Sequence, residues 1–199
     1  VQADMKRLLA YSSIENIGLL FVAIGLALLF KAYGMIGLST LALTAALFHV
    51  VAHAFFKSLL FLGTGSVLHA TGERNLGKLG GLMRSMPWVA WLCLIGILAS
   101  SGLPPLSGFV SEWLLLQSFL FTTGLPDPFF NMLVPVVAAA VALIAALAGY
   151  VMVKFFGVIF LGQSREKRLV EAHDASLLER IGLLWLAAIT VLIGLFPVY

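Results

Sequence analysis

Charged residues are scarce in this chain of 199 residues, where Asp, Glu, Lys and Arg together make up 11%. An average soluble domain has about 25%. Hydrophobic residues instead make up 61% of the sequence. This composition excludes a disordered chain and a nucleic-acid-binding domain, and it predicts an integral membrane protein. Cysteine is nearly absent too. The single Cys93 excludes a disulfide scaffold, and we expect it to pack as a small hydrophobic residue.

Motifs that bind cofactors are equally rare. The sequence has no CxxC pair and no convincing set of haem ligands, so we expect no redox centre and no cofactor. GTGS (63–66) and GKLGG (77–81) lack the strand and helix that flank a phosphate-binding loop. His49 and His53 in HVVAH have the i, i+4 spacing of zinc ligands. No Glu follows the first His and no Cys or Asp is near in sequence, so we favour no metal over a zinc site.

Long apolar runs are what the sequence does have. Five stretches contain the roughly 20 mostly apolar residues that a membrane-crossing helix requires, namely about 6–30, 37–69, 87–121, 131–160 and 178–197. The pattern predicts an all-α, polytopic transmembrane helical bundle of about five spans. The chain begins at Val1 and ends in GLFPVY, directly after an apolar run. We therefore expect residues 1–199 to be one transmembrane domain within a longer protein.

The third stretch is interrupted by SSGLPPLSG near its middle. Pro104 and Pro105 remove backbone hydrogen-bond donors, and Gly102 and Gly108 loosen the flanks. Non-helical backbone at this depth is tolerated only where it is buried in protein or lines water, and broken helices of this kind mark ion or substrate paths in transporters. The alternative is a simple proline kink.

Lysine and arginine are distributed unevenly among the connections. One set of connections holds Lys6, Arg7, Arg74, Lys78, Arg84, Arg165, Lys167, Arg168 and Arg180, whereas the other holds only Lys31. Because cytoplasmic loops carry the excess of Lys and Arg, we predict that the first helix starts in the cytoplasm. Five crossings of the cell inner membrane then leave the C-terminal end of the chain outside.

Ionisable residues inside the apolar runs are the strongest functional signal. His49, His53 and Lys57 are spaced i, i+4, i+8 and form a column on one face of their helix, rising about 6 Å per step. Glu15 and Glu112 lie at comparable depth in other helices, and either is a candidate partner of Lys57. A charged lysine at the bilayer centre costs about 2.5–3.5 kcal/mol. Polar contacts between helices can be built from Ser, Thr or Asn at less cost, so we favour a proton or cation path over structural contacts.

Three segments resemble a known family, the antiporter-like membrane subunits of respiratory complex I and of Mrp sodium/proton antiporters. They are DMKRLLAYSSIENIG, FHVVAHAFFKSLLFLGTGSVLHATGERNLGKLGGLMRSMP and SGLPPLSGFVSEWLLLQ. Within the family, YSSIENIG and GFVSEW are most similar to the membrane-bound hydrogenase and formate hydrogenlyase branch. The resemblance implies two inverted repeats, each with one broken helix, and places this chain at the end of the second repeat.

The resemblance also implies roles for the buried residues. His49, His53 and Lys57 fall on the central relay helix of the family, and Glu112 falls on its terminal relay position. Beside these positions we interpret Glu15 as a partner that sets the local field. The implied function is proton translocation, driven by electron transfer in partners that include other membrane subunits and a peripheral hydrogenase arm. Two alternatives stay open: an Mrp-type Na⁺/H⁺ antiporter subunit, and a membrane anchor that transports nothing. The relay pair expected of the first repeat is absent from this chain.

Overall fold

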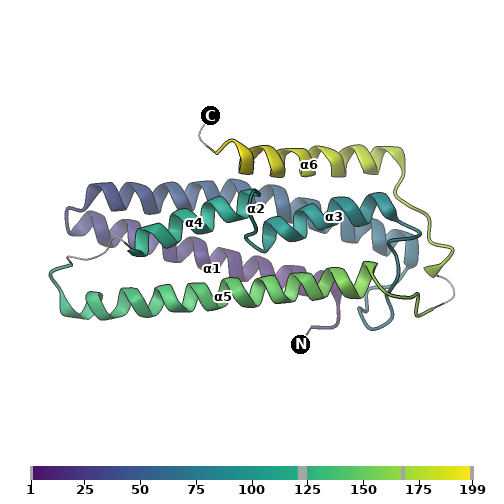
Figure 1. Ribbon diagram of the computed structural model, residues 1–199, viewed down its shortest axis with the longest axis horizontal. Coiled ribbons are helices and arrows are strands. Elements are labelled where there is room, and N and C mark those ends of the chain that lie inside the picture. The colour runs from purple at the N-terminus through teal and green to yellow at the C-terminus, as the bar shows by residue number, and fades with distance from the viewer. Residues whose placement is uncertain (1, 121–124, 167–168, 198–199) are drawn as a thin grey trace.

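The computed structural model describes residues 2–120, 125–166 and 169–197, which form an antiparallel bundle of long helices (Figure 1). The helices are α1 (Met5–Ala32), α2 (Ile36–Thr71), α3 (Pro87–Ser100), α4 (Ser107–Leu120), α5 (Pro128–Phe160) and α6 (Leu177–Leu195). The part of the chain that is described contains no β-strand beyond one isolated bridge, between Asp4 and Asn75. The prediction of an all-α membrane bundle is confirmed. Lys167, Arg168 and residue 121, which entered the predictions above, lie outside the described residues.

Five crossings account for the six helices. α1, α2, α5 and α6 are each long and apolar enough to cross a membrane. α3 and α4 have 14 residues each, and they follow one another in the same direction along the bundle, with the break between them (Figure 1). The predicted broken helix is thus two short helices joined by residues 101–106.

Three helix starts follow from local sequence signals. The Asp4 carboxylate caps α1 by accepting hydrogen bonds from the backbone nitrogens of Lys6 and Arg7. α5 begins at a proline after the cap Asp127, and Ser176 forms a capping box with Glu179 at the start of α6. These caps place the helix starts within three residues of the predicted ones.

The break begins with a regular helix terminus. Gly102 has a φ of +62°, its N–H donates to the Ala99 carbonyl at 3.2 Å, and the Leu103 N–H donates to the Leu98 carbonyl at 3.1 Å. This pair of hydrogen bonds is the Schellman motif that ends many helices. Gly108 does not loosen the flank of the break, contrary to the prediction from the sequence. A β-carbon there would overlap the Ala99 carbonyl oxygen, so the start of α4 packs tightly on the end of α3.

The proline-kink alternative is wrong. Residues 102 and 112 would lie about 15 Å apart in a continuous helix, because each residue adds about 1.5 Å. In the structure, a β-carbon at Gly102 would lie 2.9 Å from the carboxyl carbon of Glu112. A bend in one helix does not bring residues ten positions apart into contact. The chain therefore forms a non-helical loop between α3 and α4, which continue in the same direction along the bundle (Figure 1).

The basic connections gather at one end of the bundle. Backbone hydrogen bonds tie the segment before α1 to the α2–α3 connection, from Met5 N to Arg74 O at 3.0 Å and from Leu76 N to Ala3 O at 2.8 Å. The same connection is tied to the end of α5 by the bond from Leu82 N to Ile159 O at 3.3 Å. Lys31 lies at the opposite end, where α1 turns into α2 (Figure 1). The uneven distribution of Lys and Arg along the sequence is therefore also a difference between the two ends of the bundle. Which end faces the cytoplasm stays a prediction.

Candidate functional site

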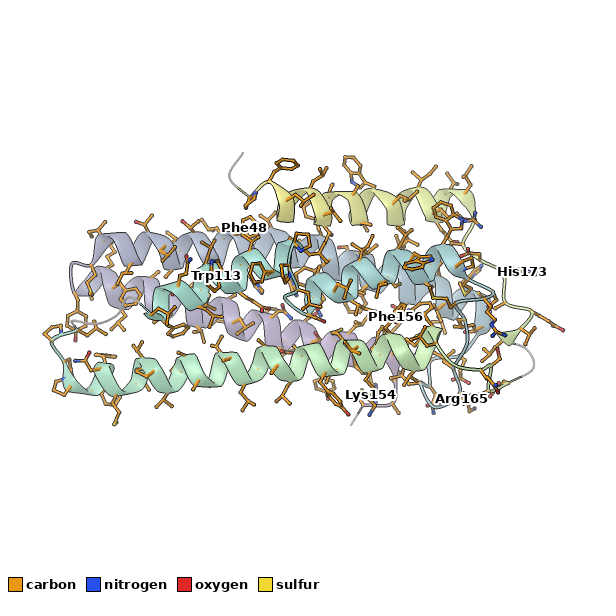
Figure 2. The ribbon with its side chains drawn as sticks, viewed as in Figure 1. Phe48, Trp113, Lys154, Phe156, Arg165 and His173 are labelled. Atoms are coloured by element: carbon orange, nitrogen blue, oxygen red, sulfur yellow. The ribbon has the colours of Figure 1, made fainter. Side chains whose placement is uncertain are left out.

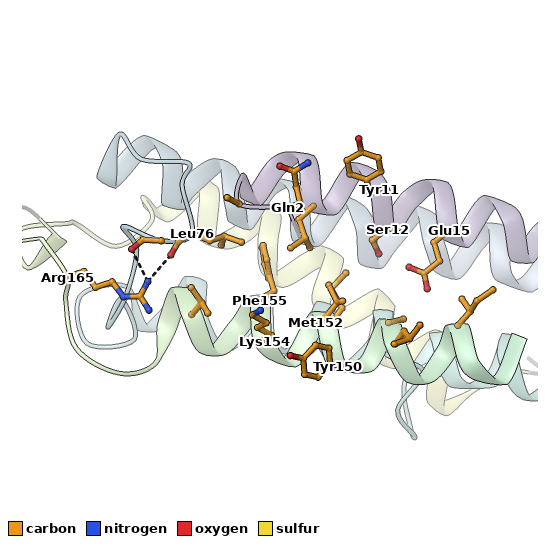
Figure 3. A pocket seen from close by; sticks show the side chains of 18 residues that line it. Gln2, Tyr11, Ser12, Glu15, Leu76, Tyr150, Met152, Lys154, Phe155 and Arg165 are labelled. Carbon is orange, nitrogen blue, oxygen red and sulfur yellow. Dashed lines mark hydrogen bonds between the residues drawn. The ribbon is translucent and has the colours of Figure 1, made fainter. Parts of the chain in front are cut away.

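Lys57 is the most deeply buried charged residue of the candidate relay, with 4% of its surface exposed. Its ammonium donates a hydrogen bond of 2.6 Å to the Ser12 hydroxyl of α1, which is also buried. The Phe56 ring centroid lies 6.0 Å from the Lys57 nitrogen. Among the described residues no carboxylate forms an ion pair with Lys57. Glu15, one turn after Ser12 and half-buried, is within electrostatic range but out of contact (Figure 3).

His49 lies two turns before Lys57 on α2 and is 6% exposed. Its Nδ1 is 2.9 Å from the Ser111 hydroxyl of α4, and that hydroxyl donates its own proton to the Gly108 carbonyl at 2.9 Å. In the tautomer in which that hydroxyl donates to Gly108, Nδ1 of His49 is the donor and Nε2 is left to accept a proton. Nε2 has no hydrogen bond of ordinary geometry, although the backbone carbonyl of Asn16 lies near the ring.

His53 lies between these two residues on the same helix. Its ring is stacked on that of His49, with centroids 6.1 Å apart and planes inclined by 27°, and it meets the Phe56 ring edge-on at 5.5 Å. The Nε2 atom of His53 is buried without a hydrogen-bond partner. The spacing in the sequence therefore does produce a column, in which two imidazole rings are in contact.

Glu112 reaches the column from the far side of the break. Its carboxylate folds over Gly102, where any β-carbon would overlap it. A cavity of about 10 Å³ lies between His49, Ser111 and Glu112, closed by apolar side chains of α1 and α2. This volume is at the lower limit for one water molecule, and the exposed wall of the cavity is almost wholly apolar. Glu112 is also within electrostatic range of Glu15.

Of the five residues predicted for the relay, His49, His53 and Lys57 form the column, Glu112 shares the small cavity with His49, and Glu15 lies within electrostatic range of Lys57 and Glu112 without contacting them. Two members of the cluster escaped the sequence interpretation, namely Ser12 and Ser111. Both signals were local: Ser12 precedes Glu15 by three positions and Ser111 precedes Glu112 by one, so each serine accompanies a buried carboxylate. Lys154 lies elsewhere, near the end of α5 and far from Trp113 of α4 (Figure 2). Within the described residues, no group of three or more His, Cys, Asp or Glu is placed to hold a metal ion.

Curated proteins of similar sequence cover almost the whole chain. Hydrogenase-4 component B of Escherichia coli K12 is 38% identical over 194 residues, and formate hydrogenlyase subunit 3 of the same organism is 39% identical over 194 residues. Na⁺/H⁺ antiporter subunit A1 of Staphylococcus saprophyticus is 36% identical over 200 residues. Each similarity covers 98% of this chain, but only 29%, 32% and 25% of the respective relatives. The chain therefore spans a third or less of their length.

Solved structures share the fold. The archaeal membrane-bound sulfane sulfur reductase has a subunit that superposes with a TM-score of 0.77 at 31% identity, over 97% of this chain and 28% of that one. Respiratory complex I from Thermus thermophilus gives a TM-score of 0.79 at 25% identity, over 98% of this chain and 36% of that one. The sequence profile described as "NADH:quinone oxidoreductase/Mrp antiporter, TM" matches residues 1–124. This chain is an integral membrane protein that belongs to the family of antiporter-like subunits of complex I and Mrp antiporters.

Proposed function

We propose that this chain is part of a proton-translocating membrane subunit, and that Lys57, His53, His49, Glu112 and Glu15 carry the proton. The observation that supports this most is the environment of Lys57. Ionisable residues inside a membrane bundle usually pair with one another or with backbone carbonyls. Here the hydrogen bond of Lys57 goes to the neutral Ser12 hydroxyl, while Glu15 attracts the ammonium from beyond contact. A proton on Lys57 is thus stabilised without being locked in an ion pair.

The histidines are suited to pass a proton on. A neutral imidazole accepts a proton at one nitrogen and can then release the proton of the other. The imidazole ring of His49 is stacked on that of His53, and its Nε2 has no hydrogen-bond partner. Its Nδ1 faces the Ser111 hydroxyl, next to the small cavity beside Glu112. A proton that reaches Nε2 allows the Nδ1 proton to leave to the Ser111 hydroxyl, which lies on the side of Glu112. Successive groups on α2 rise by about 6 Å, so side-chain movement or water must bridge each step.

We further propose that the whole protein works in a membrane-bound hydrogenase or formate hydrogenlyase complex of the cell inner membrane, with the start of α1 in the cytoplasm. Its partners would be other membrane subunits and a peripheral hydrogenase arm. The 38% and 39% identities with the two E. coli subunits support this assignment. Moving one charge against 100 mV requires about 2.3 kcal/mol, which electron transfer in the partners would supply.

The 36% identity with the staphylococcal subunit favours a second candidate, an Mrp-type Na⁺/H⁺ antiporter subunit. The two candidates differ in what crosses the membrane. Flux in sealed vesicles that depends on a sodium gradient and not on hydrogen production favours the antiporter. Flux that starts with electron transfer and is indifferent to sodium favours the hydrogenase complex.

Replacing Lys57 by methionine in the full-length protein tests the relay itself. We expect proton flux in everted membrane vesicles to fall by at least about tenfold, because the methionine fills the same space without a proton site. Lys31→Met, at the opposite turn of the bundle, is the matched control and should leave the flux unchanged. If Lys57→Met preserved both flux and hydrogen production, the chain would be an anchor and the proposal would be wrong.

A further inference from the structure

A large cavity lies between α1 and α5, and most of its lining residues lie outside the relay. Its volume is about 890 Å³, and its walls include Leu8, Ile144, Leu147, Val151 and Phe155. Several lining side chains stay open to the surroundings: Tyr11, Leu147 and Tyr150 are each more than half exposed. We call this feature the α1–α5 groove. Both helices are long and apolar enough to cross a membrane, so the groove lies at the depth of the bilayer.

The two ends of the α1–α5 groove differ in charge (Figure 3). Arg165 and Lys154 line it toward the end where the basic connections gather, and Ser12 and Glu15 line it deeper in the bundle. The Arg165 guanidinium is held in place by the carbonyls of Leu76 and Gly77 at 3.2 and 2.9 Å. In the described residues the Lys154 ammonium makes neither a hydrogen bond nor an ion pair. The groove therefore carries one fixed and one free positive charge beside apolar walls.

We propose that the α1–α5 groove binds an anionic phospholipid from the leaflet at its basic end. The phosphate group would lie at Lys154 and Arg165, with Tyr150 at the level of the headgroup, and an acyl chain would extend along the apolar walls toward Glu15. Basic pockets between transmembrane helices are known to select anionic lipid headgroups, and tyrosine is enriched at this depth of the membrane. The volume is in the range of sites that enclose small ligands.

The lipid would also affect the relay. Ser12, which holds Lys57, and Glu15 both line the α1–α5 groove. An acyl chain lying there would keep bulk water away from this side of the bundle. The lipid site itself rests on the geometry and charge of the groove and not on proton translocation.

The test compares lipid retention by the full-length complex, purified from nanodiscs that contain equal amounts of palmitoyl-oleoyl phosphatidylglycerol and phosphatidylcholine. One Lys near a membrane surface increases the binding constant for an anionic lipid about fivefold. We therefore expect Lys154→Gln to lower the ratio of retained phosphatidylglycerol to phosphatidylcholine about fivefold at this site. Lys154→Arg should keep the ratio, and Lys31→Gln, at the other end of the bundle, should leave it unchanged. Retained lipid is counted by mass spectrometry.

Cryo-electron microscopy of the same complex supplies the second measurement. Lipid density in the α1–α5 groove, with its headgroup at Lys154, would support the proposal even if Lys154→Gln proved unstable. A helix of the same protein or of a partner filling the groove would overturn it, as would equal retention of the two lipids by wild type and Lys154→Gln. Loss of flux in Lys57→Met tests the relay separately, so failure of one proposal leaves the other standing.

Discussion

Replacing Gly194 of α6 by alanine measures how closely the break is held by the rest of the bundle. A β-carbon at Gly194 would overlap the Pro105 carbonyl oxygen and lie 2.6 Å from both the carbonyl carbon of Leu106 and the nitrogen of Ser107. Ordinary contact begins at 3.4 Å, so α6 or the break must move by about 1 Å. The atoms in the way belong to the backbone, and no change of rotamer relieves the overlap. Such overpacking costs about 1–3 kcal/mol.

Gly182, on the same helix, supplies the control. A β-carbon there would meet only Leu62, at an ordinary 3.5 Å. Both substitutions gain the same helix preference of alanine over glycine, about 0.5–1 kcal/mol, so the difference between them isolates the overlap. We expect Gly194→Ala to unfold several degrees below Gly182→Ala when the full-length protein is heated in detergent. Equal unfolding temperatures would show that α6 does not clamp the break, and the packing argument would fail.

Two further predictions concern single hydrogen-bonding side chains. Ser111→Ala leaves His49 without its partner and should destabilise the protein by about 1–3 kcal/mol and lower proton flux. Ser118→Ala is the control, because it removes a buried hydroxyl whose hydrogen bond lies within α4. It should lower stability without lowering proton flux. Similar flux in the two variants would contradict the role of Ser111. Asp174→Ala removes the carboxylate that accepts from the first backbone nitrogens of α3 and should cost about 0.5–2 kcal/mol. Hydrogen exchange in the first turn of α3 should then accelerate, and Asp174→Asn, which keeps an accepting oxygen, should restore part of the protection.

The helices were predictable because their signals are local. An apolar run of sufficient length gives a crossing, and Asp4, Asp127 and Ser176 mark three of the starts within a few residues. The cap of α3 was not predictable in this way. Asp174 accepts from Trp88, which is 86 positions earlier, and only the folded arrangement of the connections brings the two together.

The candidate site likewise has a part that the sequence pattern predicts and a part that it does not. Spacing alone placed His49, His53 and Lys57 on one face, because the period of an α-helix relates residues four apart. Spacing does not say which residue of another helix stands opposite. Glu15 and Glu112 were both candidate partners of Lys57, but α1 presents Ser12 there and Glu15 one turn further on. A shift of a single turn between α1 and α2 decides between a locked ion pair and a free ammonium, and no pattern within either helix specifies that shift.

The break explains why Glu112 belongs to the cluster at all. In an uninterrupted helix its carboxylate would lie about 15 Å along the axis from residue 102. The Schellman turn at Gly102, the two prolines and the tight contact of Gly108 with Ala99 let α4 start beside the end of α3. The side chain of Glu112 then folds over Gly102, where no larger residue fits, while Ser111 of the same turn meets His49. The glycine, the prolines and the glutamate therefore form one structural unit, which interrupts a membrane crossing so that a carboxylate stands beside the histidine column.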